Sequence, residues 1–200
     1  MLRVALTGGI ATGKSHVLKL LAARGIPTID ADQVAREVVQ PGRKAWFDIR
    51  KRFGAQVFSS DGSLKRAYLA ALVFSDVKAR YELQAIVHPH VRRRIDDWFH
   101  SLHTENIRSF AVAEIPLLFE TKRETEFDWI IVTVCEPDIQ KQRLIERQGL
   151  SDDDAQKRID AQLPVSVKSE RANSVIRTDG TFGDTERQVD DVCNTLTHQH

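Results

Sequence analysis

The sequence predicts an α/β protein in which a parallel sheet of five strands is covered by helices on both faces. Short apolar runs of the kind found in buried parallel strands recur along the chain. Segments with the helical spacing of apolar residues separate these runs, and this alternation favours a parallel sheet. The 200 residues suffice for one well-buried core with a smaller appended element. The apolar runs lie at residues 3–6, 27–29, 109–114, 129–135 and 174–177.

Charge and cysteine content exclude several classes of function. Lys and Arg (29) nearly balance Asp and Glu (28), so nothing attracts the chain as a whole to nucleic acid or to an anionic membrane. Cys135 and Cys193 provide neither metal-ligand spacing nor a disulfide framework, which fits a reducing compartment. The chain enters its first strand without a charged leader, and no apolar stretch approaches the ~20 residues of a membrane span. We therefore expect an unprocessed cytoplasmic protein without nucleic-acid or membrane partners.

The segment after the first strand predicts a phosphate site. Residues 8–15, GGIATGKS, fit the pattern G-x-x-x-x-G-K-[ST] at every fixed position. The three glycines let successive backbone N–H groups turn toward an anion. Lys14 then reaches the β and γ phosphates of a nucleotide, and Ser15 offers its hydroxyl to Mg²⁺. A helix that starts here puts the phosphates at its N-terminus. A glycine-rich turn with an incidental lysine would explain the glycines but not Lys14 and Ser15.

Two carboxylates follow the second strand, in the sequence Asp30-Ala31-Asp32. In open parallel sheets ligands bind at the carboxyl ends of the strands, so both aspartates are candidates for the same crevice as the phosphate loop. Alternatively, Asp30 caps the next helix and Asp32 lies in its first turn, where the helix dipole favours an acid. The spacing alone supports both interpretations equally.

A helical block comes next. From Gln33 to His103 apolar residues recur at helical spacing, interrupted by Pro41-Gly42, Gly54 and Asp61-Gly62. Aromatic stripes of this kind usually form a core, and we expect this of Trp46, Phe53 and Trp98. A helical block inserted after a strand indicates a substrate-binding subdomain.

Within this block, Val87-His88-Pro89 predicts a break between two helices, because residues before proline avoid the helical conformation. A histidine at such a junction is usually a cap or a surface group. The basic residues Lys65-Arg66 and the arginines at 92–94 are usually solvated. An arginine that turns inward is nevertheless well suited to a bidentate contact with phosphate.

The third strand ends in an acid, Glu114. An acid at the end of a strand beside a phosphate loop often supports Mg²⁺ directly or through water, so Glu114 is a candidate for that role. After the fourth strand, Glu136-Pro137 opens a helix with proline at its first position.

That helix and the next are predicted to form an arginine-bearing hairpin. The first helix carries Arg143 and Arg147, and the second starts at the capping-box pattern Ser151-x-x-Asp154 and carries Arg158. These arginines could close over transferring phosphate, as the lids of small-molecule kinases do. A charged solvent face is the alternative, but like charges four residues apart repel and so favour a nearby anion. Pro164 is predicted to end the hairpin.

Together these motifs resemble those of dephospho-coenzyme A kinase, nearly from end to end. The resemblance rests on Leu6-Thr7-Gly8-Gly9-Ile10 leading into Gly13-Lys14-Ser15, on Ile29-Asp30-Ala31-Asp32, on Val87-His88-Pro89, on Ile115-Pro116-Leu117-Leu118-Phe119-Glu120, and on the arginine-bearing hairpin. It implies a kinase with the P-loop NTPase fold, made of a core, a helical coenzyme-binding part and a lid. It also implies transfer of the γ-phosphoryl group of ATP, with Mg²⁺, to the ribose 3′-hydroxyl of dephospho-coenzyme A, the last step of coenzyme A synthesis.

The expected organisation is therefore one P-loop kinase domain over residues 1–200. Its core takes about 1–32, 105–137 and 172–200, the coenzyme-binding subdomain about 33–104, and the lid about 138–171. We expect a monomer whose partners are dephospho-coenzyme A and ATP.

The resemblance also implies roles for individual residues. Asp32 is the base that faces the 3′-hydroxyl, Lys14 and Arg147 act on the transferring phosphate, and Ser15 binds Mg²⁺ with Glu114 as a further candidate. The residues implied to bind ATP and its phosphates are Gly8, Gly9, Ile10, Ala11, Thr12, Gly13, Lys14, Ser15, His16 and Arg143. Those implied to border the acceptor are Thr7, Asp32, Arg66, His88 and Pro116.

The sequence departs from the family pattern at a few positions. Ala11-Thr12 stands where the family usually shows Gly-Ser, a mild change if the φ angle of Ala11 is negative. Asn173 replaces a commoner aspartate, and Arg177-Thr178 is atypical, which affects the adenine-side contacts.

Two other classes of protein use a phosphate loop of this kind. Another small-molecule or nucleoside monophosphate kinase would share the loop, the helical insert and the lid, because a fold does not fix the acceptor. A non-enzymatic nucleotide switch would need N-K-x-D to read guanine and D-x-x-G to sense the γ-phosphate, and neither string occurs in the sequence.

Overall fold

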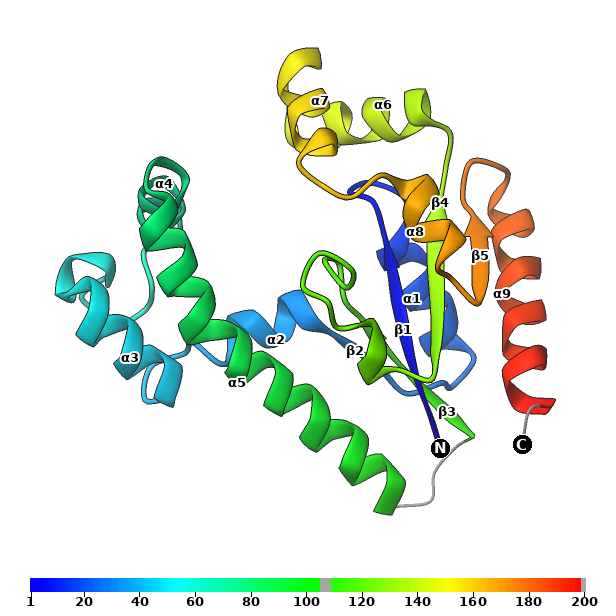
Figure 1. Cartoon of the computed structure of the whole chain (residues 1–200), viewed down its shortest axis with the longest axis horizontal. Helices are drawn as coiled ribbons and strands as arrows, with labels where there is room; N and C mark the ends of the chain where they lie inside the picture. The colour runs from blue at the N-terminus through cyan, green and yellow to red at the C-terminus, as the bar shows by residue number, and fades with distance from the viewer. Residues whose placement is uncertain (105–108, 199–200) are drawn as a thin grey trace. The chain divides into compact units, whose positions relative to one another are not determined.

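The computed structural model describes residues 1–104 and 109–198 (Figure 1). The chain divides into two compact units. The first consists of Met1–Asp30 and Ser101–His200, and the second of Ala31–His100. The helical hairpin that was expected to be a lid is part of the first unit, and Asp32 is part of the second.

The first unit is built on a sheet of five parallel strands in the order β2-β3-β1-β4-β5 (Figure 1). This confirms the predicted α/β fold. The strands are β1 (Leu2–Gly8), β2 (Thr28–Asp30), β3 (Phe110–Glu114), β4 (Trp129–Val134) and β5 (Ser174–Arg177). β1 is longer than predicted because Thr7 and Gly8 still pair with β4, opposite Val132 and Thr133. The register also places Leu6 and Asp30 opposite Glu114, so β1, β2 and β3 end at the same edge of the sheet.

Helices flank this sheet. They are α1 (Lys14–Ala23), α6 (Pro137–Gln148), α7 (Asp152–Asp160), α8 (Val165–Glu170) and α9 (Phe182–His198), with a short 3-10 turn, η2 (Glu124–Glu126). The core joins the sheet to the apolar faces of α1 and α9. Its fully buried members are Val4, Leu6, Val17, Leu21, Val112, Ile131, Ile176, Val189 and Leu196. The core therefore fixes α1, and with it the phosphate loop, against the sheet.

The predicted start and stop signals of the hairpin are confirmed. Pro137 is the first residue of α6 and Gly149 ends it in a left-handed conformation. Ser151 caps α7 by accepting a hydrogen bond from the backbone N–H of Asp154 (3.2 Å). Pro164 ends the hairpin, but the residues after it form the short helix α8, which the sequence reasoning did not predict.

The second unit is helical and has its own core. It contains α2 (Ala31–Glu37), α3 (Lys44–Phe53), the 3-10 turn η1 (Ala55–Val57), α4 (Arg66–Ser75) and most of α5 (Val77–Thr104). The core residues are Val39, Ala45, Trp46, Ile49, Phe53, Val57, Phe58, Leu69 and Ala79. Gly54 and Gly62 adopt positive φ angles at the predicted breaks, and the Trp46 indole N–H donates to the Gly62 carbonyl (2.7 Å).

The predicted break at Val87-His88-Pro89 is wrong, since Pro89 lies inside the continuous helix α5. Proline in a helix interior removes one hydrogen bond and costs about 3 kcal/mol. The helix survives because residues on both sides are anchored in cores: Ala79 before the proline, and Val91 and Ile95 after it, are all buried. Packing therefore outweighs the local preference.

One aromatic assignment also needs correction. Trp46 and Phe53 are buried as predicted, but Trp98 is only half-buried and its neighbour Phe99 is buried instead. Phe99 continues the stripe of Val91 and Ile95 at intervals of four residues, so it takes the core position.

None of the helices in residues 1–104 and 109–198 combines the length and the apolar character that crossing a membrane requires.

Candidate active site

The phosphate loop is the turn between β1 and α1 (Figure 1). Gly8 and Gly13 adopt φ angles of 152° and 86°, which favour glycine. A Cβ atom on Gly8 would also collide with Thr133 of β4. The fixed glycines at the two ends of the loop are thus required by its geometry.

Ala11 differs from the expectation. Its φ angle is +59°, in the left-handed region, so the condition for a mild change, a negative φ angle, is not met. An L-residue pays about 1–2 kcal/mol for this conformation because Cβ crowds the following carbonyl. Alanine in place of glycine therefore strains the backbone at residue 11, so the substitution is not a mild change.

Hydrogen bonds of buried threonine hydroxyls support the phosphate loop from inside the protein. The Thr12 side chain is fully buried, and its Oγ1 donates to the Gly9 carbonyl (2.8 Å) and lies 2.7 Å from Thr133 Oγ1. Thr178 Oγ1 in turn donates to the Thr12 carbonyl (3.0 Å). The side chain of Thr12, expected among the phosphate contacts, therefore serves as internal support for the loop.

Lys14 and Ser15 open helix α1. Lys14 Nζ donates to the carbonyls of Gly9 (2.7 Å) and Gly8 (3.3 Å), so its ammonium group lies over the loop that it was predicted to serve. Ser15 is exposed, which leaves its hydroxyl accessible to an ion. His16 is half-buried, and its ring meets the ring of Phe182 edge to face at 5.2 Å.

Two acids end neighbouring strands at the edge where the loop lies. Glu114 is only 5% exposed, and Asp30 is its partner in the pairing of β2 with β3. Over the part of the chain that the structure describes, no three His, Cys, Asp or Glu side chains form a ready-made metal cage.

The acceptor-side candidates come from both units. Asp32 lies in the first turn of α2, Arg66 is the first residue of α4, and His88 lies within α5. All three are exposed and belong to the second unit. Thr7 and Pro116 belong to the first unit, where the fully buried Thr7 donates its hydroxyl to the Pro116 carbonyl (3.3 Å). The Thr7 side chain therefore supports the loop after β3.

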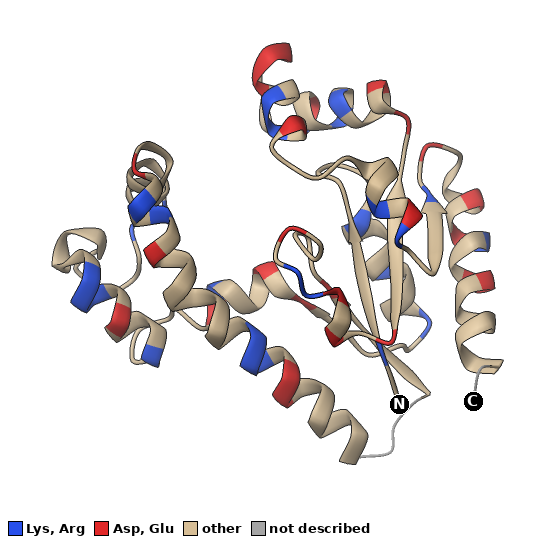
Figure 2. Ribbon diagram, viewed as in Figure 1, with Lys and Arg blue, Asp and Glu red and all other residues tan. Residues whose placement is uncertain are grey.

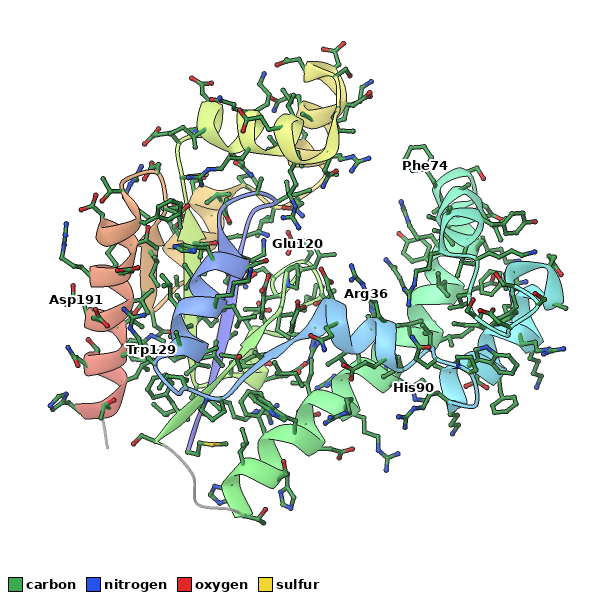
Figure 3. All side chains as sticks on the ribbon, turned by 180° about the vertical axis from the view of Figure 1, so that it is seen from behind. Arg36, Phe74, His90, Glu120, Trp129 and Asp191 are labelled. Carbon is green, nitrogen blue, oxygen red and sulfur yellow. The ribbon has the colours of Figure 1, made fainter. Side chains whose placement is uncertain are left out.

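Glu120, the last residue of the motif quoted above, lies in that loop (Figure 3). Glu120 Oε1 lies 2.7 Å from the ammonium nitrogen of Lys168, which is fully buried, and accepts the backbone N–H of Leu163 (3.0 Å). Burial acts to raise the pKa of Glu120, but the hydrogen bonds from Lys168 and Leu163 outweigh it and hold this pKa below its ordinary value.

The hairpin arginines have separate partners. Arg143 donates to the carbonyl (2.6 Å) and the hydroxyl (3.1 Å) of Thr178, while Arg158 bonds the side chain of Gln148. Acidic and basic residues are interspersed along α6 and α7 (Figure 2), and Lys141 pairs with Asp152 between them (2.9 Å). The anchored Arg143 thus differs from the predicted group of mutually repelling arginines.

Two glutamines were missed by the sequence analysis. Gln140 Nε2 donates to the carbonyl of Ile10 (2.8 Å), and the N–H of Ile10 donates to Gln162 Oε1 (2.7 Å). No sequence signal marks them, because neither belongs to a motif.

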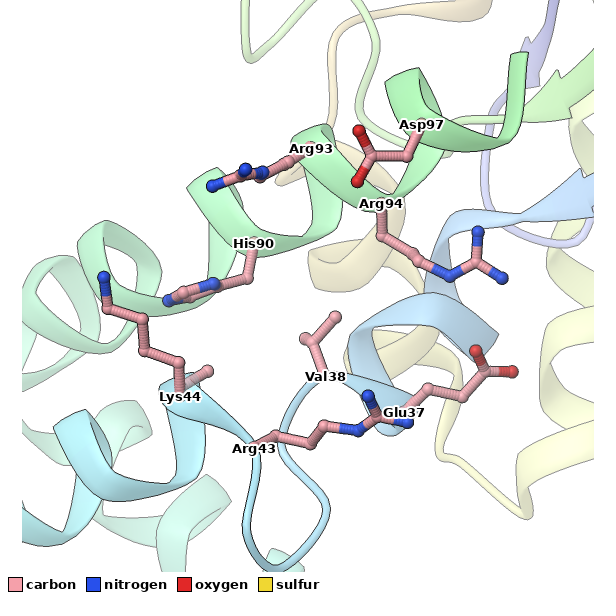
Figure 4. A pocket seen from close by; sticks show the side chains of 9 residues that line it. Glu37, Val38, Arg43, Lys44, His90, Arg93, Arg94 and Asp97 are labelled. Atoms are coloured by element: carbon pink, nitrogen blue, oxygen red, sulfur yellow. The ribbon is translucent and has the colours of Figure 1, made fainter. Parts of the chain in front are cut away.

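The second unit has a separate basic hollow of about 200 Å³ (Figure 4). Its lining residues come from α2, α3, α5 and the connection between α2 and α3, and are Glu37, Val38, Arg43, Lys44, Ala45, His90, Arg93, Arg94 and Asp97. None of them was among the predicted site residues.

A phosphate loop between β1 and α1 of a five-stranded parallel sheet, followed by an arginine-bearing hairpin, defines a P-loop kinase. Comparison with known proteins specifies the class further. The model of the family described as dephospho-CoA kinase matches residues 2–184. The chain belongs to the dephospho-CoA kinase family.

Individual relatives agree with this assignment. The dephospho-CoA kinase of Geobacillus kaustophilus is 41% identical over 188 residues, which cover 94% of this chain and 93% of the relative. The crystal structure of TT1252 from Thermus thermophilus is 32% identical with a TM-score of 0.82, and 98% of each chain is covered. The dephospho-CoA kinase from Campylobacter jejuni shares the fold at 24% identity, with a TM-score of 0.75 and 98% of each chain covered.

Proposed function

We propose that this chain transfers the γ-phosphoryl group of ATP to the ribose 3′-hydroxyl of dephospho-coenzyme A. The observation that carries the proposal is the family match over residues 2–184, which includes an intact phosphate loop on the expected strand and helix. In the reaction, O3′ forms a bond to the γ phosphorus while the bond from that phosphorus to the β–γ bridging oxygen breaks. The products are coenzyme A and ADP.

The phosphate loop and α1 bind the triphosphate in this proposal. Backbone N–H groups of the loop at the N-terminus of α1 bind the anion in this proposal, and Lys14 supplies positive charge where charge develops in the transition state. Arg147 and Arg143 of α6 are the lid residues proposed to act on the phosphates and the nucleotide.

The ligands available for Mg²⁺ fit that ion. Ser15 offers an exposed hydroxyl and Glu114 a carboxylate at the edge of the sheet, and hard oxygen ligands are what Mg²⁺ prefers. When bound, Mg²⁺ neutralises charge on the phosphates.

Asp32 is proposed as the base. An alcohol is a poor nucleophile at neutral pH, so a carboxylate within hydrogen-bond reach orients the 3′-hydroxyl and accepts its proton as the bond to phosphorus forms. Asp32 is exposed in the first turn of α2, only two residues after the strand end at Asp30. Its exposure leaves the carboxylate accessible to an acceptor.

The second unit is proposed to bind the coenzyme part of the acceptor, with Arg66 and His88 bordering it. Thr7 and Pro116 are also proposed to bind the acceptor. We further propose that the enzyme acts as a cytoplasmic monomer without nucleic-acid partners.

A coupled assay that detects ADP tests the activity. Dephospho-coenzyme A should support turnover, and NMR should locate the new phosphate on the 3′-oxygen of the product. Phosphorylation of AMP, CMP or UMP without phosphorylation of dephospho-coenzyme A would overturn the proposal and favour a nucleoside monophosphate kinase.

A further inference from the structure

Both backbone groups of Ile10, in the middle of the phosphate loop, are bonded by glutamine side chains. Gln162 accepts from its N–H (2.7 Å) and Gln140 donates to its carbonyl (2.8 Å). Because a backbone N–H only donates and a carbonyl only accepts, these bonds also fix which way each amide points. Gln140 lies in the first turn of α6, and Gln162 follows the end of α7. The loop is therefore held from both ends of the hairpin.

The neighbours of Ile10 show how closely this part of the loop is packed. A Cβ atom on Gly9 would come within 2.7 Å of both Gln140 Nε2 and Val165 Cγ2, so glycine lets these side chains of α6 and α8 approach the loop without a shift. On the other side of Ile10, Ala11 is held at a φ angle of +59°. A strained conformation of this kind persists only where the surroundings impose it, and the bonds to Ile10 contribute to imposing it.

The segment that carries Gln162 is itself anchored in the first unit. Its next residue, Leu163, donates its N–H to Glu120 (3.0 Å), which is paired with the buried ammonium of Lys168 in α8 (2.7 Å). Gln140 is only 5% exposed. Both amides are therefore held in place before they meet Ile10, as a pair of positioning groups must be.

We propose that Gln140 and Gln162 are positioning residues for phosphoryl transfer. They hold the two peptide groups on either side of the Ile10 Cα so that the following N–H groups face the phosphates, and they make the shape of the loop depend on the position of the hairpin. Neutral amides suit this place, because a carboxylate at position 162 would bring negative charge toward the triphosphate, and a lysine there would be unable to accept the Ile10 N–H. This inference rests on the proposed use of the loop for ATP.

Gln140→Met and Gln162→Met test the proposal, since methionine keeps the length of glutamine and removes both polar groups. Each change should raise KM for ATP about 2- to 10-fold, because the loss of one hydrogen bond weakens binding by about this factor. KM for the acceptor should stay near wild type, and the melting temperature should fall by no more than a few degrees. Matched controls are Gln142→Met on α6 and Gln156→Met on α7, whose amides bond exposed acids, Glu146 and Asp160. The controls should leave KM for ATP unchanged.

The double variant separates a shared action from two local effects. Because both amides act on the backbone of the same residue, Ile10, the loss in Gln140→Met/Gln162→Met should be clearly smaller than the product of the single losses. A wild-type KM for ATP in folded Gln162→Met, or losses that multiply, would overturn the proposal. If Gln140→Met fails to fold, the half-buried Gln162 decides the matter.

Calorimetric titration with ATP in the absence of an acceptor measures ATP binding directly. Its result therefore does not depend on which acceptor the enzyme uses. If Gln162→Met binds ATP more weakly and the wild type does not turn over dephospho-coenzyme A, the inference stands and the proposed function is rejected. Unchanged ATP binding in that variant, with normal wild-type turnover, would reject the inference alone.

Discussion

Lys14 is the residue whose removal tests the phosphate loop most directly. In Lys14→Ala the charge that develops on the γ-phosphoryl group loses the positive charge that Lys14 supplies in the proposed function. Turnover should fall about 10²–10³-fold, as it does when other preorganised donors to a developing charge are removed. The fold should survive, because the Lys14 ammonium bonds carbonyls of the phosphate loop, while the core that fixes α1 against the sheet is apolar. Near-normal turnover in a folded variant would mean that another site handles the phosphates.

Asp32 is tested by its amide. Asp32→Asn keeps the shape of the side chain but cannot accept the proton, so turnover should fall about 10²–10⁴-fold while ATP affinity changes little. A helix-capping or dipole role predicts a different result, because asparagine caps about as well as aspartate. Asp30→Asn is the matched control. If that control loses turnover and Asp32→Asn does not, the base has been assigned to the wrong aspartate.

Ala11 offers a test of backbone strain. Ala11→Gly should leave the free energy of unfolding unchanged or raise it by up to about 1 kcal/mol, because relief at a φ angle of +59° offsets the added freedom of the unfolded chain. Ala22→Gly, on the exposed face of α1, should instead lower it by about 1 kcal/mol. Urea unfolding measures both. An equal loss in the two variants would show that Ala11 is not strained.

Among larger elements, α8 depends on the pair of Glu120 with Lys168. Removing the charge in Glu120→Gln leaves a fully buried ammonium without its carboxylate, which should cost about 3 kcal/mol. Because the pKa of Glu120 is lowered in the folded state, the pair stabilises the protein above the ordinary value of 4.5 and ceases to do so as pH falls through the lowered pKa.

The pH dependence of melting supplies the check on that pair. The melting temperature of both proteins is measured from pH 7 to pH 3. Below pH 4.5 the wild type should lose stability faster than Glu120→Gln, so the difference in stability between the two proteins should shrink. A difference that stays constant across this range would show that the Glu120 charge is not what stabilises α8.

The hairpin of α6 and α7 should respond to nucleotide. Arg147 and the bonded glutamines link this element to the phosphate site in the proposed function, so ATP should slow hydrogen exchange across residues 140–165. Exchange that is identical with and without ATP would count against a lid.

At the scale of the whole molecule, the two units should respond to different ligands. ATP should protect residues 8–16 of the first unit from exchange, and the acceptor should protect residues of the second unit near Arg66 and His88. Protection by the acceptor that is confined to the first unit would contradict the coenzyme-binding role proposed for the second.

The sequence was most informative where structure is local. The five strands, the phosphate loop and the caps at Pro137 and Ser151 follow from short patterns, and the structure confirms them. Pro89 was misread because packing along α5 outweighs the local preference of proline. Gln140 and Gln162 escaped notice because polar residues far from Ile10 in sequence leave no periodic signal. The angle of Ala11 is likewise set by its neighbours rather than by its own preference.

The strand order has a consequence for how the chain folds during synthesis. β1 is central, yet both strands that border it, β3 and β4, come after the helical unit, so that Leu2 pairs with Phe110 and Val4 with Trp129. At about 5–20 residues per second, a ribosome leaves β1 without its neighbours for on the order of ten seconds. The helical unit, whose core residues lie between Val39 and Ala79, can pack in that interval. The nascent chain is therefore expected to gain helical structure first and a nucleotide site only after β4 has emerged.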